Sequence, residues 1–286
     1  MTVEEAYLEC RAVARREARN FYFGFVLLDR PRRNAIHAAY AFSRRCDDSV
    51  DGDEPMDWKL DQLASRRREI SACAEGRPDR EDGVLVALSD AIARYGIPVT
   101  SLEAIVDGVE MDLTTTRYDD FPALKRYCDR VAGAVGVVSL HIFGFDDPRA
   151  PGHAEDLGVA LQIINIMRDV AEDSGLGRIY LPREDMLRHG VSEADIAAGT
   201  VTPAVRALLA EQGARARSFY GEGRQLLPLL DRRARMCVGT LSGLYLKILD
   251  SIESRGYDVF TERVSLSTGQ KVRLMLGRSL AAFASR

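Results

Sequence analysis

Helical spacing of apolar residues runs through almost the whole chain of 286 residues. An amphipathic helix repeats apolar residues every three or four positions, whereas a half-buried strand alternates apolar and polar residues. Six long segments have the helical spacing: 32–49, 102–113, 124–143, 154–172, 203–230 and 235–255. None of them alternates with period two, and strand-like runs between hairpin turns are missing. The pattern therefore predicts an all-α fold.

The breaks between these segments are short and contain glycine, proline or aspartate. They fall at 76–80, 96–98, 146–152, 174–177 and 181–182. None has the length or composition of a flexible linker between domains. A chain of this length could hold two domains, but one large helical domain fits the pattern equally well. We expect a single domain over residues 1–286 with about ten helices.

The charge balance argues against a protein that binds nucleic acid. The chain has 39 basic and 43 acidic side chains, a formal net charge of −4. It therefore lacks the excess positive charge with which a protein attracts a polyanion. The five cysteines are scattered and show no CxxC spacing. This disfavours a zinc ribbon or a disulfide scaffold and indicates a reducing compartment, so we expect a cytoplasmic protein.

No segment predicts a secretory signal or a membrane span. The first twenty residues are charged throughout and lack the apolar stretch of a signal peptide. The longest stretch without a formal charge, 131–145, contains glycines and a histidine and predicts a buried core helix instead. A peripheral contact with a membrane and the oligomeric state both stay open at this stage.

An acidic cluster in the first helical segment is unusual for a helix. In AYAFSRRCDDSVDG (39–52), a rotation of about 100° per residue places four side chains on one stripe, with Asp48 at its edge. The four are Tyr40, Arg44, Asp47 and Asp51. Carboxylates one turn apart repel each other and destabilise the helix. A cation bound between them would turn this repulsion into attraction.

A second polar stripe lies on the segment 157–182. Four side chains fall within about 80° of one another on the helical wheel: Gln162, Asn165, Asp169 and Asp173. The rest of this segment is apolar nearly all round, which predicts a buried helix. Buried carboxylates need a partner or a metal ion. We therefore expect the polar stripe to face an internal cavity.

Two acidic pairs, one in each half of the chain, predict a magnesium–diphosphate site. Magnesium prefers oxygen ligands and is usually held by one or two carboxylates, water and phosphate oxygens of the substrate. Two pairs on facing helices could hold several ions around one diphosphate. Arg44, Arg168 and Arg178 lie close enough in sequence to add charge-assisted hydrogen bonds to the same oxygens.

Simpler interpretations explain one acidic pair but not both. A single pair on a helix is usually a solvated face, yet each pair here stands beside an arginine on an apolar helix. Residues 47–52 copy the start of an EF-hand loop, but the twelfth position is Trp58 instead of glutamate. A dinucleotide fingerprint, a Walker sequence and a defensible catalytic triad are missing.

Four strings, in this order, resemble the squalene/phytoene synthase family, the head-to-head prenyl diphosphate synthases. They are AYAFSRRCDDSVDG (39–52), RYCDRVAGAVG (126–136), LQIINIMRDVAEDSGLGRIYLP (161–182) and YLKILDSIESRGYDVFTERVSLS (245–267). The third is the most specific, and the resemblance covers 20–266. It implies one all-α isoprenoid synthase domain, with the two acidic motifs facing each other across a central apolar cavity. It also implies prenyl diphosphate substrates and Mg²⁺, and the missing membrane-anchoring tail is typical of bacterial members.

The resemblance also implies roles for individual residues. Those matching the metal-diphosphate ligands are Asp47, Asp48, Asp51, Asn165, Asp169 and Asp173. Those matching the diphosphate end of the cavity are Arg44, Arg168, Arg178, Tyr180 and Tyr245, and Gln162 matches a polar substrate-binding residue that precedes the second motif. Tyr127 matches a catalytic tyrosine near the reacting carbons, and Phe21 and Tyr40 match aromatic residues at the cavity mouth. The chain has Asn20 where family members often carry serine.

These residue types suit the ionisation of an allylic diphosphate. Metal ions and arginines neutralise the leaving diphosphate, so the carbon–oxygen bond breaks without a covalent enzyme intermediate. The resulting cation must be kept from water, which an apolar cavity does, and aromatic faces stabilise it. In the family, the double bond of a second prenyl diphosphate attacks this cation and forms a cyclopropylcarbinyl diphosphate.

The substrate is the main alternative that stays open. Two farnesyl diphosphates would give presqualene diphosphate, and then squalene if NADPH reduces the last cation; two geranylgeranyl diphosphates would give phytoene. The strings HIFGF (141–145) and GVEMDL (108–113) resemble bacterial squalene-type members more, so we expect farnesyl diphosphate. The alternatives that stay open are the phytoene synthase just described, a related prenyltransferase with an aromatic acceptor, and a non-catalytic helical module that binds a metal or a partner.

Overall fold

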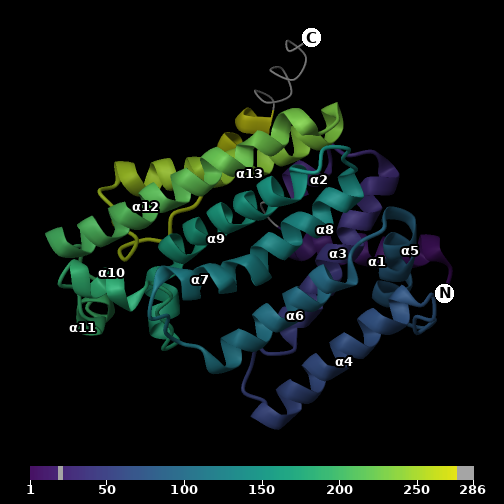
Figure 1. Cartoon of the computed structure of the whole chain (residues 1–286), viewed down its shortest axis with the longest axis horizontal. Helices are drawn as coiled ribbons and strands as arrows, with labels where there is room; N and C mark the ends of the chain where they lie inside the picture. Colours follow the sequence, from purple (N-terminus) through teal and green to yellow (C-terminus); the bar gives the residue numbers. More distant parts are fainter. Residues whose placement is uncertain (19–21, 276–286) are drawn as a thin grey trace.

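The computed structural model describes residues 1–18 and 22–275, and these residues form an all-helical molecule (Figure 1). Its ten longer helices are α1 (Val3–Glu17), α3 (Arg30–Asp48), α4 (Met56–Ala74), α5 (Gly83–Tyr95), α6 (Val99–Thr114), α7 (Phe121–Cys128), α8 (Ala134–Phe143), α9 (Ala150–Gly175), α12 (Pro203–Gly223) and α13 (Arg232–Ser254). The shorter elements are α2 (Tyr22–Phe25), the π-helical turn η1 (Asp129–Gly133), α10 (Arg183–Arg188), α11 (Glu193–Ala197) and the 3-10 segment η2 (Arg224–Leu229).

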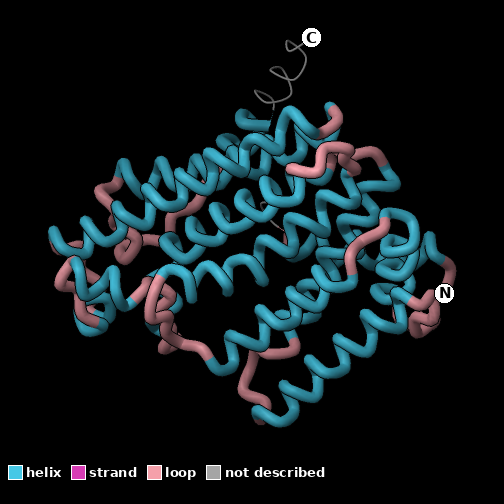
Figure 2. The backbone as a smooth tube through the Cα atoms, in the orientation of Figure 1, coloured by secondary structure: helices cyan, strands magenta, loops and turns pink. Residues whose placement is uncertain are grey.

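The predicted fold class is confirmed. Figure 2 shows helices joined by loops, and the described residues contain no strand, only an isolated bridge between Arg117 and Ile179. None of the described helices is long and apolar enough to cross a membrane. Side-chain caps set several helix starts: Asp29 accepts from the backbone N–H of Arg32 before α3, and Asp231 caps α13 in the same way.

Three longer helices were missed by the sequence prediction, and all three lie on the side of the molecule that holds α3 and α6 (Figure 1). Helix α4 buries only Leu63, Ile70 and Cys73, so its apolar stripe is too narrow to give a clear periodic signal. Helix α1 buries mostly small residues, and α5 is apolar over most of its surface. The segment 124–143, predicted as one helix, is divided into α7, η1 and α8.

The buried apolar side chains form two clusters that meet along α9. The first cluster draws on α1, α3, α5, α6 and α8, and the second on α9, α12, α13 and the segment after α9. Helix α9 contributes to both, and the side chains of Phe219 and Leu246 pack against both. This shared helix also carries the second acidic motif.

Helix α9 approaches η1 and α8 closely at two glycines. A Cβ atom at Gly158 would lie 2.4 Å from the carbonyl oxygen of Ala132, and one at Gly136 would lie 2.5 Å from that of Ala154. Such distances leave no room for a side chain, so glycine is required at both positions for the backbones to pack this closely. Side chains from both α8 and α9 line the internal cavity described below.

Candidate active site

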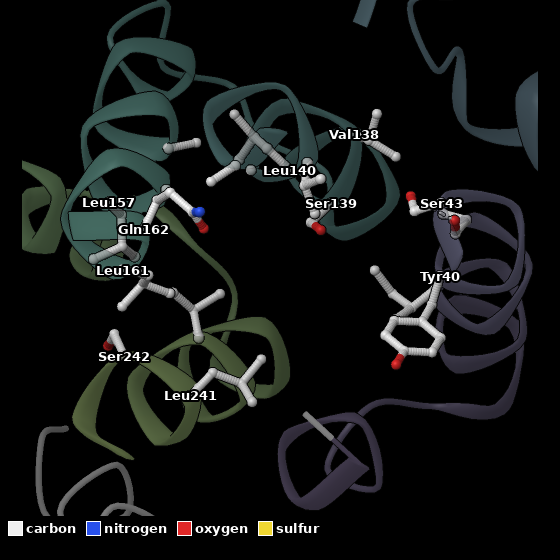
Figure 3. A pocket seen from close by; sticks show the side chains of 18 of the residues that line it. Tyr40, Ser43, Val138, Ser139, Leu140, Leu157, Leu161, Gln162, Leu241 and Ser242 are labelled. Atoms are coloured by element: carbon white, nitrogen blue, oxygen red, sulfur yellow. Dashed lines mark hydrogen bonds between the residues drawn. The ribbon is translucent and has the colours of Figure 1, made fainter. Parts of the chain in front are cut away.

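A cavity of about 310 Å³ lies between α3, α8, α9 and α13. Figure 3 shows Tyr40 and Ser43 of α3, Ser139 and Leu140 of α8, Leu161 and Gln162 of α9, and Leu241 and Ser242 of α13 around it. Most of the lining side chains are apolar. The expected central apolar cavity is therefore present.

The cavity has one polar end. Along α9 the lining residues change from Asn165 and Gln162 to Leu157 and Ala154 toward the start of the helix. The same change occurs along α3, from Asp47 down to Ile36, and along α13, from Tyr245 down to Val238. The three polar ends belong together, because Tyr245 of α13 interacts with Arg168 and Asp169 of α9 and also with Tyr40 of α3. A ligand with a charged head and an apolar tail would fit this arrangement.

The first acidic motif lies at the end of a helix and not within it. Helix α3 ends at Asp48, so the prediction that Asp51 continues the helical stripe was wrong. The backbone N–H groups of Val50 and Asp51 both donate to the carbonyl of Asp47, and the chain then turns away at Gly52, whose φ is +99°. Asp51 still lies one turn beyond Asp47, but on a tight turn stabilised by these hydrogen bonds.

Arg44 lies among all three aspartates of this motif. Its guanidinium nitrogens are 3.6 Å from Asp47, 2.7 Å from Asp48 and 3.2 Å from Asp51. Burial raises the pKa of Asp47 to about 7, because the charge of Arg44 only partly offsets it and the neighbouring carboxylates add to the shift. Asp47 is also the one aspartate of this motif that lines the cavity.

The second acidic motif lies on α9 as predicted and is also paired with arginines. Arg168 donates two hydrogen bonds to Asp169, at 2.8 and 2.5 Å, and the Nε of Arg263 donates a third at 2.8 Å. Burial favours a higher pKa for Asp169, but these bonds lower it overall. Burial, followed by the charges of Asp169 and Glu172, raises the pKa of Asp173 to about 7.

Arg263 is a site residue that the sequence analysis did not single out. It follows α13 in the chain, 94 residues beyond Asp169, and also lies 3.4 Å from Glu172. It falls inside the fourth matching string, but no local spacing relates it to the second motif. Only the tertiary fold brings it there.

Asp112 of α6 is a second residue that was missed. Its two carboxylate oxygens accept from the hydroxyls of Tyr127, at 3.2 Å, and Tyr180, at 2.8 Å. Its backbone carbonyl accepts from Arg178 at 3.3 Å. Burial raises the pKa of Asp112, and its charge in turn raises the pKa of Asp47 and of Asp173. Asp112 is therefore close to both acidic motifs.

The aromatic candidates occupy different places. Tyr40 lines the cavity and contacts Phe25 edge-on, with ring centroids 6.4 Å apart. Tyr127 does not line this cavity; it is 4% exposed and packs against Tyr180 and Tyr118 beside Asp112. Phe21 lies outside the described residues.

The donor set at the polar end fits magnesium. Within residues 1–18 and 22–275, no group of three or more His, Cys, Asp or Glu side chains is close enough together to hold a metal ion without other ligands. Magnesium needs only one or two carboxylates when water and phosphate oxygens complete its shell. The Oδ1 atom of Asn165 is buried without a hydrogen-bond partner in the described part of the chain, so a further oxygen donor is available.

Comparison with known proteins extends over nearly the whole chain. The squalene/phytoene synthase family model matches residues 14–270. Phytoene synthase of Mycobacterium bovis is 39% identical over 275 residues, which cover 95% of this chain and 90% of that protein. The 15-cis-phytoene synthase of Synechococcus elongatus is 37% identical over 283 residues, which cover 95% of this chain and 91% of that protein. A dehydrosqualene synthase solved with a ligand superposes with a TM-score of 0.90 at 26% identity, covering 99% and 98% of the two chains. Squalene synthase HpnC from Alicyclobacillus acidocaldarius gives 0.84 at 28% identity, covering 90% and 96%.

Proposed function

The chain belongs to the squalene/phytoene synthase family and is therefore a prenyltransferase; from this premise we propose that it joins two prenyl diphosphates head to head. The observation that carries the proposal is the apolar cavity with a single polar end. A prenyl chain fits the apolar part, and its diphosphate fits the end where carboxylates and arginines gather. The assignment to an enzyme family sets aside the non-catalytic module considered from the sequence.

Each part of the site has a task in this reaction. Mg²⁺ would be held by Asp47 and Asp51 of the first motif and by Asn165, Asp169 and Asp173 of α9, and when bound it would neutralise the leaving diphosphate. Arg44, Arg168 and Arg263 would donate to the diphosphate oxygens. Leu157, Leu161 and Leu241 exclude water from the allylic cation, and the face of Tyr40 stabilises it.

We propose geranylgeranyl diphosphate as the substrate and phytoene as the product. The support is that relatives at 37–39% identity, matched over nearly their whole length, are named phytoene synthases. This differs from the farnesyl diphosphate expected from the sequence strings. Farnesyl diphosphate stays the second candidate, because the solved neighbours with TM-scores of 0.90 and 0.84 are named dehydrosqualene and squalene synthases. NADPH would be needed as a reductant only if farnesyl diphosphate is the substrate and squalene is the product.

The test is a product analysis with purified protein. The protein is incubated with Mg²⁺ and either geranylgeranyl or farnesyl diphosphate, with and without NADPH, and phosphatase-treated products are identified by mass spectrometry. A forty-carbon hydrocarbon supports phytoene synthesis, and a thirty-carbon product moves the assignment to the second candidate. Diphosphate release without a coupled product contradicts head-to-head condensation.

A matched pair of variants ties the activity to the site. Asp169→Asn removes a carboxylate that accepts from two arginines at the polar end, and we expect product formation to fall at least a hundredfold. Asp147→Asn removes a carboxylate paired with Arg149 at the other end of α9 and should leave product formation unchanged. Equal activity of the two variants would contradict the proposed site.

A further inference from the structure

We propose that Arg44, Arg168 and Arg263 are exchangeable counter-ions, which hold the site carboxylates until metal and diphosphate arrive together. When both ligands bind, the carboxylates leave the guanidinium groups and coordinate the metal, and the guanidinium groups form hydrogen bonds to the diphosphate instead. Metal and diphosphate must then bind cooperatively, each weakly without the other. The inference rests on the proposed function, since it assumes that the polar end takes a metal–diphosphate pair.

At the first motif, one arginine occupies the space between the potential ligands. Arg44 is within 4 Å of Asp47, Asp48 and Asp51 at the same time. A cation that bridges Asp47 and Asp51 would therefore compete with its guanidinium group. The side chains of Asp48 and Asp51 are 59% and 61% exposed, and ion pairs this open to solvent are weak enough to exchange.

At the second motif, Asp169 is the carboxylate that is already engaged. Both of its oxygens accept from Arg168, and one of them also accepts from Arg263. Arg263 is the more accessible of the two donors, because its side chain is 56% exposed, whereas that of Arg168, on α9 itself, is 12% exposed. Three of the four lone-pair positions of this carboxylate are therefore taken, and a metal ion that binds both of its oxygens must displace at least one of these donors.

The chemistry of the groups makes the exchange favourable only when both ligands are present. Metal alone leaves displaced guanidinium groups without an anion, and diphosphate alone meets the carboxylates. With both, each guanidinium gains phosphate oxygens, which accept its forked donors as well as a carboxylate does. Such coupling is reciprocal: metal raises the affinity for diphosphate by the same factor by which diphosphate raises the affinity for metal.

The experiment measures binding rather than turnover. Binding of Mn²⁺ alone is followed by electron paramagnetic resonance. Binding of labelled inorganic pyrophosphate is measured by equilibrium dialysis, once with a chelator that removes metal ions and once at a buffered concentration of free Mn²⁺. For the unmodified protein we expect Mn²⁺ to raise the pyrophosphate affinity by about tenfold or more. In Arg44→Gln we expect tighter binding of Mn²⁺ alone, together with a smaller gain in pyrophosphate affinity.

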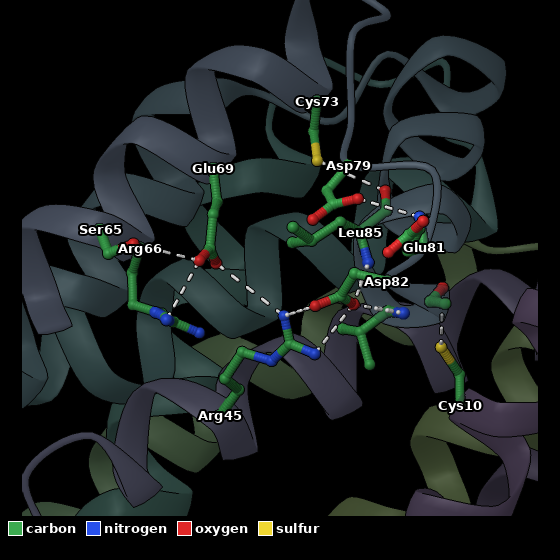
Figure 4. Close-up of polar contacts among 12 residues, drawn as sticks. Cys10, Arg45, Ser65, Arg66, Glu69, Cys73, Asp79, Glu81, Asp82 and Leu85 are labelled. Carbon is green, nitrogen blue, oxygen red and sulfur yellow. Dashed lines mark hydrogen bonds and ion pairs between the residues drawn. The ribbon is translucent and has the colours of Figure 1, made fainter.

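Two controls separate exchange from a general effect of charge. Arg45 is the next residue on α3, but it donates to Asp82 at 2.7 and 2.9 Å and lies near Glu69 (Figure 4). Arg45→Gln therefore removes the same charge without freeing a site carboxylate. Because Arg45 is largely buried, the exposed Arg149→Gln, at the far end of α9, serves if Arg45→Gln does not fold. Neither control should change the Mn²⁺ affinity.

The outcomes distinguish this inference from the proposed function. If Arg44→Gln binds Mn²⁺ no better than the unmodified protein, or no better than Arg45→Gln, the exchange is overturned. Independent binding of Mn²⁺ and pyrophosphate also overturns it, but leaves the proposed function standing. If neither ligand binds in any combination, the proposed function itself fails.

Discussion

The carboxylates of the site differ in how readily they ionise, although all are aspartates. Asp169 receives hydrogen bonds from Arg168 and Arg263, which lower its pKa despite burial. Asp47 and Asp173 lack this full compensation, and burial raises the pKa of each to about 7. Near neutral pH the metal-free site therefore carries less negative charge than its residues suggest. Binding of the proposed metal ion would have to remove the remaining protons.

This difference predicts a pH dependence of metal binding. Asp47 and Asp173 must be ionised to bind a cation, so metal affinity should fall as pH drops through 7 and level off above it. Between pH 8 and pH 6 the loss should be about tenfold for each carboxylate that titrates. Measuring the Mn²⁺ affinity from pH 8 to pH 6 checks this prediction. In Asp173→Asn the affinity should depend less steeply on pH. A constant affinity from pH 8 to 6 would refute the shifted pKa values.

Asp112 predicts an effect on turnover through the tyrosines that it holds. In Asp112→Asn one carboxylate oxygen becomes an amide NH₂, so only one of the hydroxyls of Tyr127 and Tyr180 keeps its acceptor. We expect kcat to fall about tenfold or more, with KM within about twofold. Asp107→Asn, on the same helix but paired with Arg67, is the matched control. Equal kcat values for the two variants would show that the hydrogen bonds that Asp112 accepts from the two tyrosines are not needed for turnover.

The sequence predicted the parts of the site that a single helix brings together. Gln162, Asn165, Asp169 and Asp173 share one face of α9, because positions three and four apart on a helix are neighbours. Asp112 and Arg263 could not be found in this way, since they reach the motifs from other elements across many residues. The position of Asp51 was also not predictable from helical spacing, because the helix ends before it.

At the scale of elements, the periodic signal is reliable where a helix buries a broad apolar face. Helices α9 and α13 bury many large side chains and were predicted with nearly the observed ends. Helix α4 was missed because its buried face is narrow. The π-helical turn η1 has no periodic signature, and it lies where Gly158 of α9 approaches the backbone of Ala132. A local change in helix type there accompanies tertiary contact.

The α9–η1 contact predicts a loss of stability in Gly158→Ala. The new methyl group would meet the Ala132 carbonyl at 2.4 Å, which only a backbone shift relieves. We expect the free energy of unfolding to fall by about 1–3 kcal/mol. Gly152→Ala, in the first turn of the same helix, meets nothing within 4 Å and should be neutral or stabilising. Urea titration followed by circular dichroism measures both; similar effects would contradict the close approach.

At the scale of the whole molecule, the proposed active site lies where the two apolar clusters meet. Asp47 is carried by α3, whose buried side chains belong to the first cluster, and Asp169 by α9 among residues of the second. The distance between the motifs therefore depends on how firmly the clusters are joined. The joint consists of α9 itself, with Phe219 and Leu246 packed against both sides. Shared side chains of this kind favour unfolding as one cooperative unit.

This shared core predicts one unfolding transition for both halves of the site. Leu88→Ala, in the first cluster, and Ile164→Ala, in the second, each remove a fully buried side chain. Each should lower the free energy of unfolding by about 2–5 kcal/mol. Because the clusters share α9, we expect either change to move the whole transition, with calorimetric and van't Hoff enthalpies equal. If the clusters unfolded separately, each variant would shift only one of two transitions, and the geometry of the site would then depend on an interface rather than on a common core.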